Sequence, residues 1–473
     1  MAEDSASHGN KMGVVAATFM VAGNMMGSGV FMLPANLAAF GSISLLGWLT
    51  TTAGAVALAL TFSSLASIYP AAGGPYAYAR KAFGDYMGYQ TNMVYWVANV
   101  IGNVGLGVAG IGYLTHFVPA LEHPYAAAGA EIFVIWLLAY ANMLGPRFIG
   151  FVQSVATSIK LLPIVGVAVF GWLWFSPELF CSAWNVSGES PFQAYTNTIN
   201  LTLWAFIGVE SASVSAGVVR NPRRNVPIAT ISGVLLAGGC YILSSSVIMG
   251  MIPNRELLAS SAPFADAVRV ALGEAAGHVV AGCAALGCIG SLGGWIMIVS
   301  QSAKAAADDG LFGAIFSRAN EQGAPVSGLL IVAVLMSLMV LFTISPAASQ
   351  QFGKLASTAV ILTLMPYLYS CISMKVVGFN VLKPNQYFLH VLIGFFGAIF
   401  CMAALISSNV TQTRWSLIFV IATIVFYSAT ITRQREIAEG RLHPGGLAPR
   451  WVRGITLVTT LCLLAFTFWL TVE

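Results

Sequence analysis

Two ionisable side chains lie inside long apolar stretches of this sequence. Glu210 is part of Trp204-Ala-Phe-Ile-Gly-Val-Glu-Ser211, and Lys160 is part of Ser158-Ile-Lys-Leu-Leu-Pro163. A charge at membrane depth costs at least a few kcal/mol and is retained mainly for function. We therefore predict that Glu210 is functional and a candidate proton site. The alternative is a protonated or hydrogen-bonded glutamate that faces a neighbouring helix.

Lys160 supports two functional hypotheses. A fixed ammonium there can take the place of a bound cation, or the group can release a proton during a reaction cycle. A purely structural tie between two helices is an equally valid interpretation. Lys160 is therefore a candidate proton site whose role stays open at this stage.

Glycines interrupt two of the apolar stretches. Gly23-Asn-Met-Met-Gly-Ser-Gly29 contains Asn24, Gly27 and Ser28, and Gly208 precedes Glu210 in the other stretch. Free backbone amides at a new helix start can bind a carboxylate. Close packing of helices is the alternative explanation for such small residues. Matching breaks in the first and sixth helices are what two inverted five-helix repeats would produce, with a solute site near the membrane midplane.

Aromatic residues lie deep within several of the same stretches, away from the interfaces where Trp and Tyr usually collect. Aromatic faces attract organic cations. For any single ring, core packing is the simpler explanation, and only the grouping with the two breaks favours a binding site. The residues are Tyr95, Trp96, Trp204, Trp295 and Tyr367.

The elements that must position these residues are membrane-spanning helices. Of 473 residues, 58% are hydrophobic and 8% are charged, whereas soluble domains have about 25% charged residues. Twelve stretches reach the roughly 20 residues that a span requires. We predict an all-α polytopic membrane protein with a polar tail at 1–12, which lacks the features of a signal peptide, and one twelve-helix domain at 13–432 with repeats at about 13–175 and 194–377.

The charges indicate orientation and exclude some functions. The net charge of +4 is small and dispersed, so we expect no nucleic-acid partner. The cysteines lack metal-ligand spacing, and we expect neither a metal nor a cofactor. Most basic residues fall in loops that face the cytoplasm if the amino terminus does. A basic cytoplasmic loop would follow at 433–453, and 454–472 is a candidate thirteenth span, with an interfacial hairpin or a helix lying against the bundle as alternatives.

Several longer motifs resemble those of the basic amino acid/polyamine antiporters in the amino acid–polyamine–organocation superfamily, and within them the arginine/agmatine antiporters. The similarity extends from about residue 12 to about residue 427. The matching motifs are Ala22-Gly-Asn-Met-Met-Gly-Ser-Gly-Val-Phe31, Gly73-Gly-Pro-Tyr-Ala-Tyr-Ala-Arg80, Tyr89-Gln-Thr-Asn92, Trp204-Ala-Phe-Ile-Gly-Val-Glu-Ser-Ala-Ser213, Asn221-Pro-Arg-Arg-Asn-Val-Pro-Ile-Ala-Thr230, Gly290-Ser-Leu-Gly-Gly-Trp295 and Ala305-Ala-Ala-Asp-Asp-Gly310.

The resemblance implies a leucine-transporter-like fold of two inverted five-helix repeats plus two helices, usually as a homodimer. It implies that Ser28 and the amides of Gly27 to Gly29 bind the substrate carboxylate. The α-amino group would meet the carbonyls of Trp204 and Ile207, with Trp295 stacked on the side chain and its distal end at Ala98, Asn99 and Asn103. Tyr95, Trp204 and Glu210 would form an inner gate, Tyr367 an outer gate, and Tyr76 a position tied to pH response.

The sequence departs from the arginine/agmatine pattern at three places. Ala359 replaces a serine that helps to bind guanidinium, and Asn99 also differs; both resemble the lysine/cadaverine relatives. Lys160 resembles the fifth-helix lysine of sodium-independent amino acid transporters, which occupies the place of a sodium ion. The stretch at 454–472 exceeds the twelve helices of the family.

We therefore expect an antiporter, not an enzyme, in a bacterial inner membrane. It would exchange external arginine for internal agmatine by alternating access and would support acid resistance together with a cytoplasmic amino acid decarboxylase. Lysine/cadaverine or ornithine/putrescine exchange is the neighbouring hypothesis, and proton-coupled uptake through Lys160 is a different mechanism. No sequence motif supports an intramembrane enzyme or a solute sensor.

Overall fold

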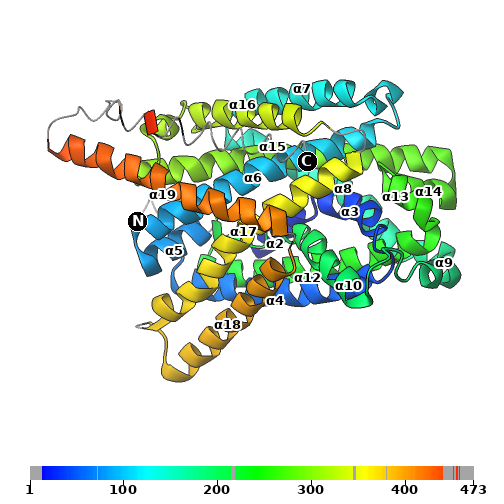
Figure 1. Cartoon of the computed structure of the whole chain (residues 1–473), viewed down its shortest axis with the longest axis horizontal. Coiled ribbons are helices and arrows are strands. Elements are labelled where there is room, and N and C mark those ends of the chain that lie inside the picture. Colours follow the sequence, from blue (N-terminus) through cyan, green and yellow to red (C-terminus); the bar gives the residue numbers. More distant parts are fainter. Residues whose placement is uncertain are drawn as a thin grey trace.

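A computed structural model describes residues 13–71, 73–214, 219–344, 348–379, 381–408 and 410–439, together with isolated positions beyond residue 450. Helices account for all regular structure in this part of the chain (Figure 1). The predicted tail at 1–12 and nearly all of the candidate span at 454–472 lie outside the described residues. The prediction of an all-α protein is confirmed.

Ten helical stretches are long and apolar enough to cross a membrane. Their hydrophobicity and length are the direct reason for helix formation, because a span in hydrocarbon must satisfy its backbone polar groups internally. The helices are α2 with α3 (Val14–Met25 and Ser28–Leu37), α4 (Ser44–Ile68), α6 (Asp85–Leu114), α7 (Pro124–Asn142), α8 (Pro146–Phe170), α12 (Pro222–Met251), α15 (Glu274–Asp308), α17 (Ala348–Phe379), α18 (Pro384–Ile406) and α19 (Val410–Ala438).

Two further segments coincide with the other two stretches that the sequence predicts as spans. One is α16 (Val326–Phe342), an apolar helix just below the usual spanning length. The other is the interrupted pair α10 (Pro191–Trp204) and α11 (Ser211–Val214). In the described residues the helices therefore follow the predicted order, and the first and sixth predicted spans are interrupted.

Both predicted helix breaks are present. The first span stops at Met25 and restarts at Ser28, and the amide of Gly27 donates to the carbonyl of Met25 instead of continuing the helical pattern. In the sixth span the helix stops at Trp204 and restarts at Ser211. Gly208 adopts a φ of 107° there, a conformation that residues with a Cβ rarely adopt.

Short helices cover the two ends of the bundle. Helix α5 (Pro75–Phe83) lies at one end, and α9 (Pro177–Ser182), α13 (Asn254–Ala259) and α14 (Pro263–Leu272) lie at the other (Figure 1). We call these the α5 end and the α14 end. Short 3₁₀ turns add to the connections: η1 (Pro119–Glu122), η2 (Gly171–Trp174) and η4 (Ala314–Ser317).

Helix α6 is the most buried span and packs against α15 and α17, whereas α18 and α19 are mostly exposed. One boundary differs from the prediction. Helix α19 continues to Ala438, so the first residues of the predicted loop at 433–453 are helical. Polar residues can extend a helix past its apolar part, and here the Gln434 side chain donates to the carbonyl of Gly310.

Candidate functional site

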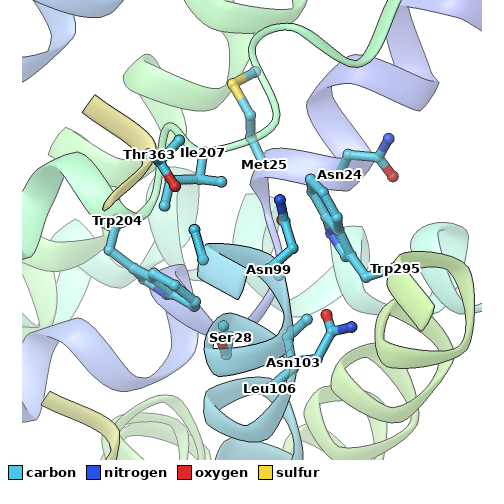
Figure 2. A pocket seen from close by; sticks show the side chains of 14 residues that line it. Asn24, Met25, Ser28, Asn99, Asn103, Leu106, Trp204, Ile207, Trp295 and Thr363 are labelled. Carbon is cyan, nitrogen blue, oxygen red and sulfur yellow. The ribbon is translucent and has the colours of Figure 1, made fainter. Parts of the chain in front are cut away.

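A cavity lies between the two helix breaks (Figure 2). Its walls come from α2, α3, α6, α15, α17 and the break of the sixth span. It measures about 30 Å³, which holds a water or two and not an amino acid. A larger solute would require its side chains to move. The predicted substrate-binding residues that line it are Asn24, Gly27, Ser28, Gly29, Ala98, Asn99, Asn103, Trp204, Ile207 and Trp295.

Trp204 and Trp295 lie on opposite sides of this cavity (Figure 2). Both depend on glycines for their positions. A Cβ at Gly208 would lie 3.3 Å from the Trp295 ring, and a Cβ at Gly29 would lie 2.9 Å from the Trp204 ring. Trp204 also meets Phe352 edge to face, with ring centroids 5.8 Å apart. The glycines of the two breaks therefore set the ring positions as well as the backbone.

Two polar atoms in the cavity wall have no hydrogen-bond partner among the described residues. They are the hydroxyl of Ser28 and Nδ2 of Asn103, and both residues are buried. Buried polar groups are nearly always paired, so these atoms are free to bind a solute. Ser28 is also the first residue of α3, whose first-turn amides have no partner within the helix.

Ala359 is the one predicted binding residue outside the cavity wall. A Cβ at Gly102 would lie 3.9 Å from that of Ala359, so the alanine lies just behind the lining residue Gly102. Thr363, one helical turn further along α17, lines the cavity and donates to the carbonyl of Ala359. The sequence analysis missed Gly102 and Thr363. Gly102 comes four residues after the predicted Ala98, and Thr363 comes four residues after the predicted Ala359.

Glu210 is fully buried and accepts hydrogen bonds from three elements. Tyr95 of α6 donates to Oε1 at 2.8 Å, Tyr367 of α17 donates to Oε2 at 2.5 Å, and the amide of Gly208 donates to Oε2 at 3.2 Å. The hydroxyl of Tyr367 thus shares this carboxylate with that of Tyr95, and the assignment of the two tyrosines to separate gates stays a prediction. We call Tyr95, Glu210 and Tyr367 the carboxylate cluster.

Lys160 joins α8 to the first helix break. Its Nζ donates to the carbonyl of Gly23 at 2.7 Å and to the hydroxyl of Ser291 at 2.6 Å. In a continuous helix the Gly23 carbonyl would accept from the amide of Gly27, four residues on, but that amide donates to Met25. The ammonium thus satisfies an acceptor that the break releases. A Cβ at Gly287 would lie 2.5 Å from that of Lys160, so this glycine makes room for the lysine.

Comparison with known proteins agrees with this architecture. A family model of amino acid permeases matches residues 12–469. The chain belongs to the amino acid permease family. This permease is 39% identical to the cadaverine/lysine antiporter of Escherichia coli strain K12 over 443 residues, which cover 92% of this chain and 97% of the relative. It is 38% identical to the putrescine transporter PotE of the same strain over 407 residues, covering 86% and 92%.

The PotE putrescine transporter of Haemophilus influenzae is 37% identical over 402 residues, covering 85% of the permease and 92% of the relative. The predicted resemblance to basic amino acid/polyamine antiporters is therefore confirmed at the level of the family. The permease is a multi-pass membrane protein and a transporter, not an enzyme.

A glutamine that the sequence analysis missed supports the first break of the permease. Gln153 of α8 donates from Nε2 to the side-chain oxygen of Asn24. A Cβ at Gly294 would lie 2.4 Å from the Gln153 side chain, so α15 provides space for it. Gln153 and Lys160, both on α8, therefore bond to adjacent residues of the first broken span.

Tyr76 lies away from the cavity, at the α5 end. Its hydroxyl donates to Asp309 Oδ2 at 2.5 Å, and Arg80 pairs with Asp309 at 2.6 Å and with Asp85 at 2.7 Å. Burial, together with the hydrogen bond to Asp309, raises the pKa of the Tyr76 phenol. These contacts tie α5 to the ends of α6 and α15.

A third ionisable residue lies within the spans, which the sequence analysis did not single out. Glu131 of α7 is 3% exposed, and its Oε1 has no hydrogen-bond partner among the described residues. An ionisable side chain at membrane depth is costly and is retained mainly for function, and this argument applies to Glu131 as it does to Glu210 and Lys160. Its surroundings are separate from the cavity between the breaks.

Proposed function

We propose that this permease exchanges a cationic amino acid for the amine formed by its decarboxylation. The observation that carries the proposal is the chemistry of the cavity between the breaks. A helix start and an unpaired serine hydroxyl suit a carboxylate, the Trp295 ring suits an alkyl or cationic chain, and two asparagines suit a distal polar group. A decarboxylated amine keeps every contact except the carboxylate contacts, so one site can serve both solutes in turn.

Lysine with cadaverine is the pair that we favour. Ala359 offers no hydroxyl behind Gly102, so a guanidinium would lose one partner while a compact ammonium would not need it. The Asn103 amide can present its oxygen to an ammonium, because amide oxygen and nitrogen exchange places on a flip. The relatives named for cadaverine, lysine and putrescine agree with this choice.

Arginine with agmatine, the pair expected from the sequence motifs, is the competing choice. A planar guanidinium stacks on an aromatic face better than an ammonium does, and Trp295 offers such a face in the cavity. In either case we propose a homodimer in a bacterial inner membrane, with a cytoplasmic amino terminus. Coupled to a decarboxylase that consumes a proton, the exchange would raise internal pH.

Exchange in liposomes tests the proposal. Labelled lysine is expected to enter vesicles preloaded with lysine or cadaverine and not empty vesicles, because an unloaded carrier crosses poorly. Competition by arginine, agmatine, ornithine and putrescine then ranks the substrate pairs. Stronger competition by agmatine than by cadaverine would reverse our choice of pair, and equal uptake into empty vesicles would refute exchange.

Proton-coupled uptake is a second candidate, favoured by Lys160. No acidic side chain pairs with this buried ammonium within the described part of the chain. In the exchange mechanism that we favour, we propose that Lys160 does not release a proton and acts as a fixed cation at the first break. Uptake into empty vesicles driven by a pH gradient, and lost in Lys160→Met, would instead establish a proton-coupled mechanism.

A further inference from the structure

A second and larger cavity lies at the α14 end of the molecule. It measures about 350 Å³, against about 30 Å³ for the cavity between the breaks. Its walls come from the outer part of α6, η1, the start of α7, the segment after α13 and the start of α17. This volume is within the range of small-molecule sites.

Glu131 is the feature of this cavity that points to a ligand. It lines the cavity, is 97% buried, and has an Oε1 without a partner among the described residues. A buried carboxylate without a partner is costly and takes up a proton instead. A cation that reaches the group favours its charged form and binds to it.

The backbone of α6 makes room for this carboxylate. A Cβ at Gly107 would lie 2.5 Å from Glu131 Oε1, a distance that no real side chain tolerates. The glycine lies one helical turn beyond Asn103 of the first cavity, a rise of about 6 Å. The two cavities therefore share α6 but draw on different residues of it.

The lining of the cavity selects the class of cation. No Lys, Arg or His is among the lining residues, and the nearby Asp266 is already engaged by Ser260 and Arg269. No group of three metal-binding side chains occurs in the described residues, and the cavity is far larger than a bare ion. Apolar side chains, among them Ile111, Leu121 and Ile344, line it between the polar ones, as a methylene chain requires.

A second carboxylate lies at the rim. Glu122 of η1 lines the same cavity and is exposed. Helix α7 begins two residues later, at Pro124, and carries Glu131 about two turns along, a rise of roughly 10 Å from its start. An amino acid would bring a carboxylate into a lining without a cationic side chain, whereas a diamine would offer an ammonium to each glutamate.

We propose that this cavity is a second binding site, for an alkyl diammonium ion, with Glu131 as its buried counter-ion and Glu122 at its rim. The choice of a diamine rests on the proposed function, but the site uses none of the residues of the exchange site. A diamine can therefore bind there while the cavity between the breaks is occupied.

Equilibrium binding of labelled cadaverine to the purified full-length protein tests the proposal. The wild-type protein is expected to bind two molecules per chain. Trp295→Leu should weaken one of them, and Glu131→Gln should weaken the other by about tenfold or more, as the loss of a charge-assisted hydrogen bond predicts. Labelled lysine is expected to bind once per chain in both the wild-type protein and Glu131→Gln.

Glycine variants provide a matched pair that leaves Glu131 in place. Gly107→Ala displaces the carboxylate and should lose the same site as Glu131→Gln. Gly105→Ala, on the same helix, would place its Cβ 3.8 Å from its neighbours and should keep both sites. Glu131→Asp should recover part of the binding that Glu131→Gln loses.

The possible outcomes separate this inference from the proposed function. One cadaverine per chain, unchanged in Glu131→Gln and Gly107→Ala, overturns the second site while exchange in liposomes still stands. Two sites that both survive these substitutions overturn the role of Glu131. Exchange that fails although the Glu131-dependent site binds cadaverine refutes the proposed function and leaves the second site intact.

Discussion

Three buried ionisable residues differ in how many hydrogen bonds their side chains form with neighbours. Glu210 accepts three hydrogen bonds, Lys160 donates two, and Glu131 has an oxygen without a partner in the described residues. A fully bonded group rigidifies its surroundings, while an unsatisfied one gains most from a ligand. At the residue scale, then, the hydrogen bonds of Glu210 and Lys160 join different helices, whereas an oxygen of Glu131 is available for the ligand that we propose.

Replacing the ring of Trp295 tests the exchange site. Trp295→Leu removes the aromatic face but keeps an apolar side chain, so we expect lysine and cadaverine to bind about tenfold more weakly, because a cation–π contact is worth roughly 1 kcal/mol or more. Trp172→Leu is the control, since Trp172 is exposed and bonds only to the nearby carbonyl of Ala168. Equal affinities in both variants would remove Trp295 from the site.

Removal of the Glu210 carboxylate tests the carboxylate cluster. Glu210→Ala leaves two buried hydroxyls, those of Tyr95 and Tyr367, without their acceptor, at a cost of about 1–3 kcal/mol each. We expect exchange to be abolished while the protein still inserts, as measured by counterflow in vesicles and by membrane content. Glu210→Gln, which keeps one acceptor, should retain partial exchange. Normal turnover of Glu210→Ala would contradict a gating role.

At the scale of elements, the two broken spans are supported in different ways. The first break is held from outside by two side chains of α8, Lys160 on the Gly23 carbonyl and Gln153 on Asn24. The second has a contact within the break, where the Glu210 side chain accepts from the Gly208 amide. It is also held from outside by Tyr95 and Tyr367, which donate to Glu210, and by Tyr241, which donates to the Ala205 carbonyl.

An alanine at Gly208 tests the second break. The positive φ costs a residue with a Cβ about 1–2 kcal/mol, and the added methyl would lie 3.3 Å from the Trp295 ring. We expect Gly208→Ala to lower both the melting temperature in detergent and the affinity for lysine.

Gly239→Ala is the matched control for that substitution. Gly239 lies within α12, and no atom lies within 4 Å of a Cβ placed there. Alanine is favoured over glycine inside a helix by about 1 kcal/mol, so this variant should be at least as stable as the wild-type protein. Unchanged affinity in Gly208→Ala would show that the break does not position the ring.

Across the whole molecule, α6 links every proposed site. Tyr95 belongs to the carboxylate cluster, Asn99 and Asn103 face the cavity between the breaks, and Gly107 abuts Glu131. From Tyr95 to Gly107 the helix rises about 18 Å. At the α5 end, Tyr76 and Arg80 of α5 both bond to Asp309, which directly follows α15.

Tyr76 at the α5 end bears on how exchange responds to pH. The pKa of Tyr76 is raised above its ordinary value of about 10 by burial and by Asp309. A raised pKa favours the protonated phenol in the folded state, so its contribution to stability is complete below about pH 10 and is lost only as the pH rises beyond that value. The phenol therefore stays protonated at physiological pH.

Tyr76→Phe should consequently change the rate of exchange without moving the midpoint of its pH profile. The rate is expected to change because Asp309 loses a hydrogen-bond donor that helps to close the α5 end. Exchange measured between about pH 5 and pH 8 provides the test, with Tyr140→Phe, at an exposed position of α7, as control. A midpoint displaced in Tyr76→Phe alone would mean that the phenol itself titrates.

Hydrophobicity by itself determined the helical fold, and glycines marked both breaks, because backbone in hydrocarbon must be helical except where it borders a cavity. Residues at those breaks gave part of the cavity wall, and the resemblance to the basic amino acid/polyamine antiporters added those of α6. Tertiary structure decided what sequence spacing does not encode. It brought Tyr367 of α17 onto the same carboxylate as Tyr95 of α6, placed Gln153 beside Asn24, and left Glu131 against a glycine of another helix. Each of these contacts joins different helices, and the relative rotation and depth of packed helices depend on the whole bundle.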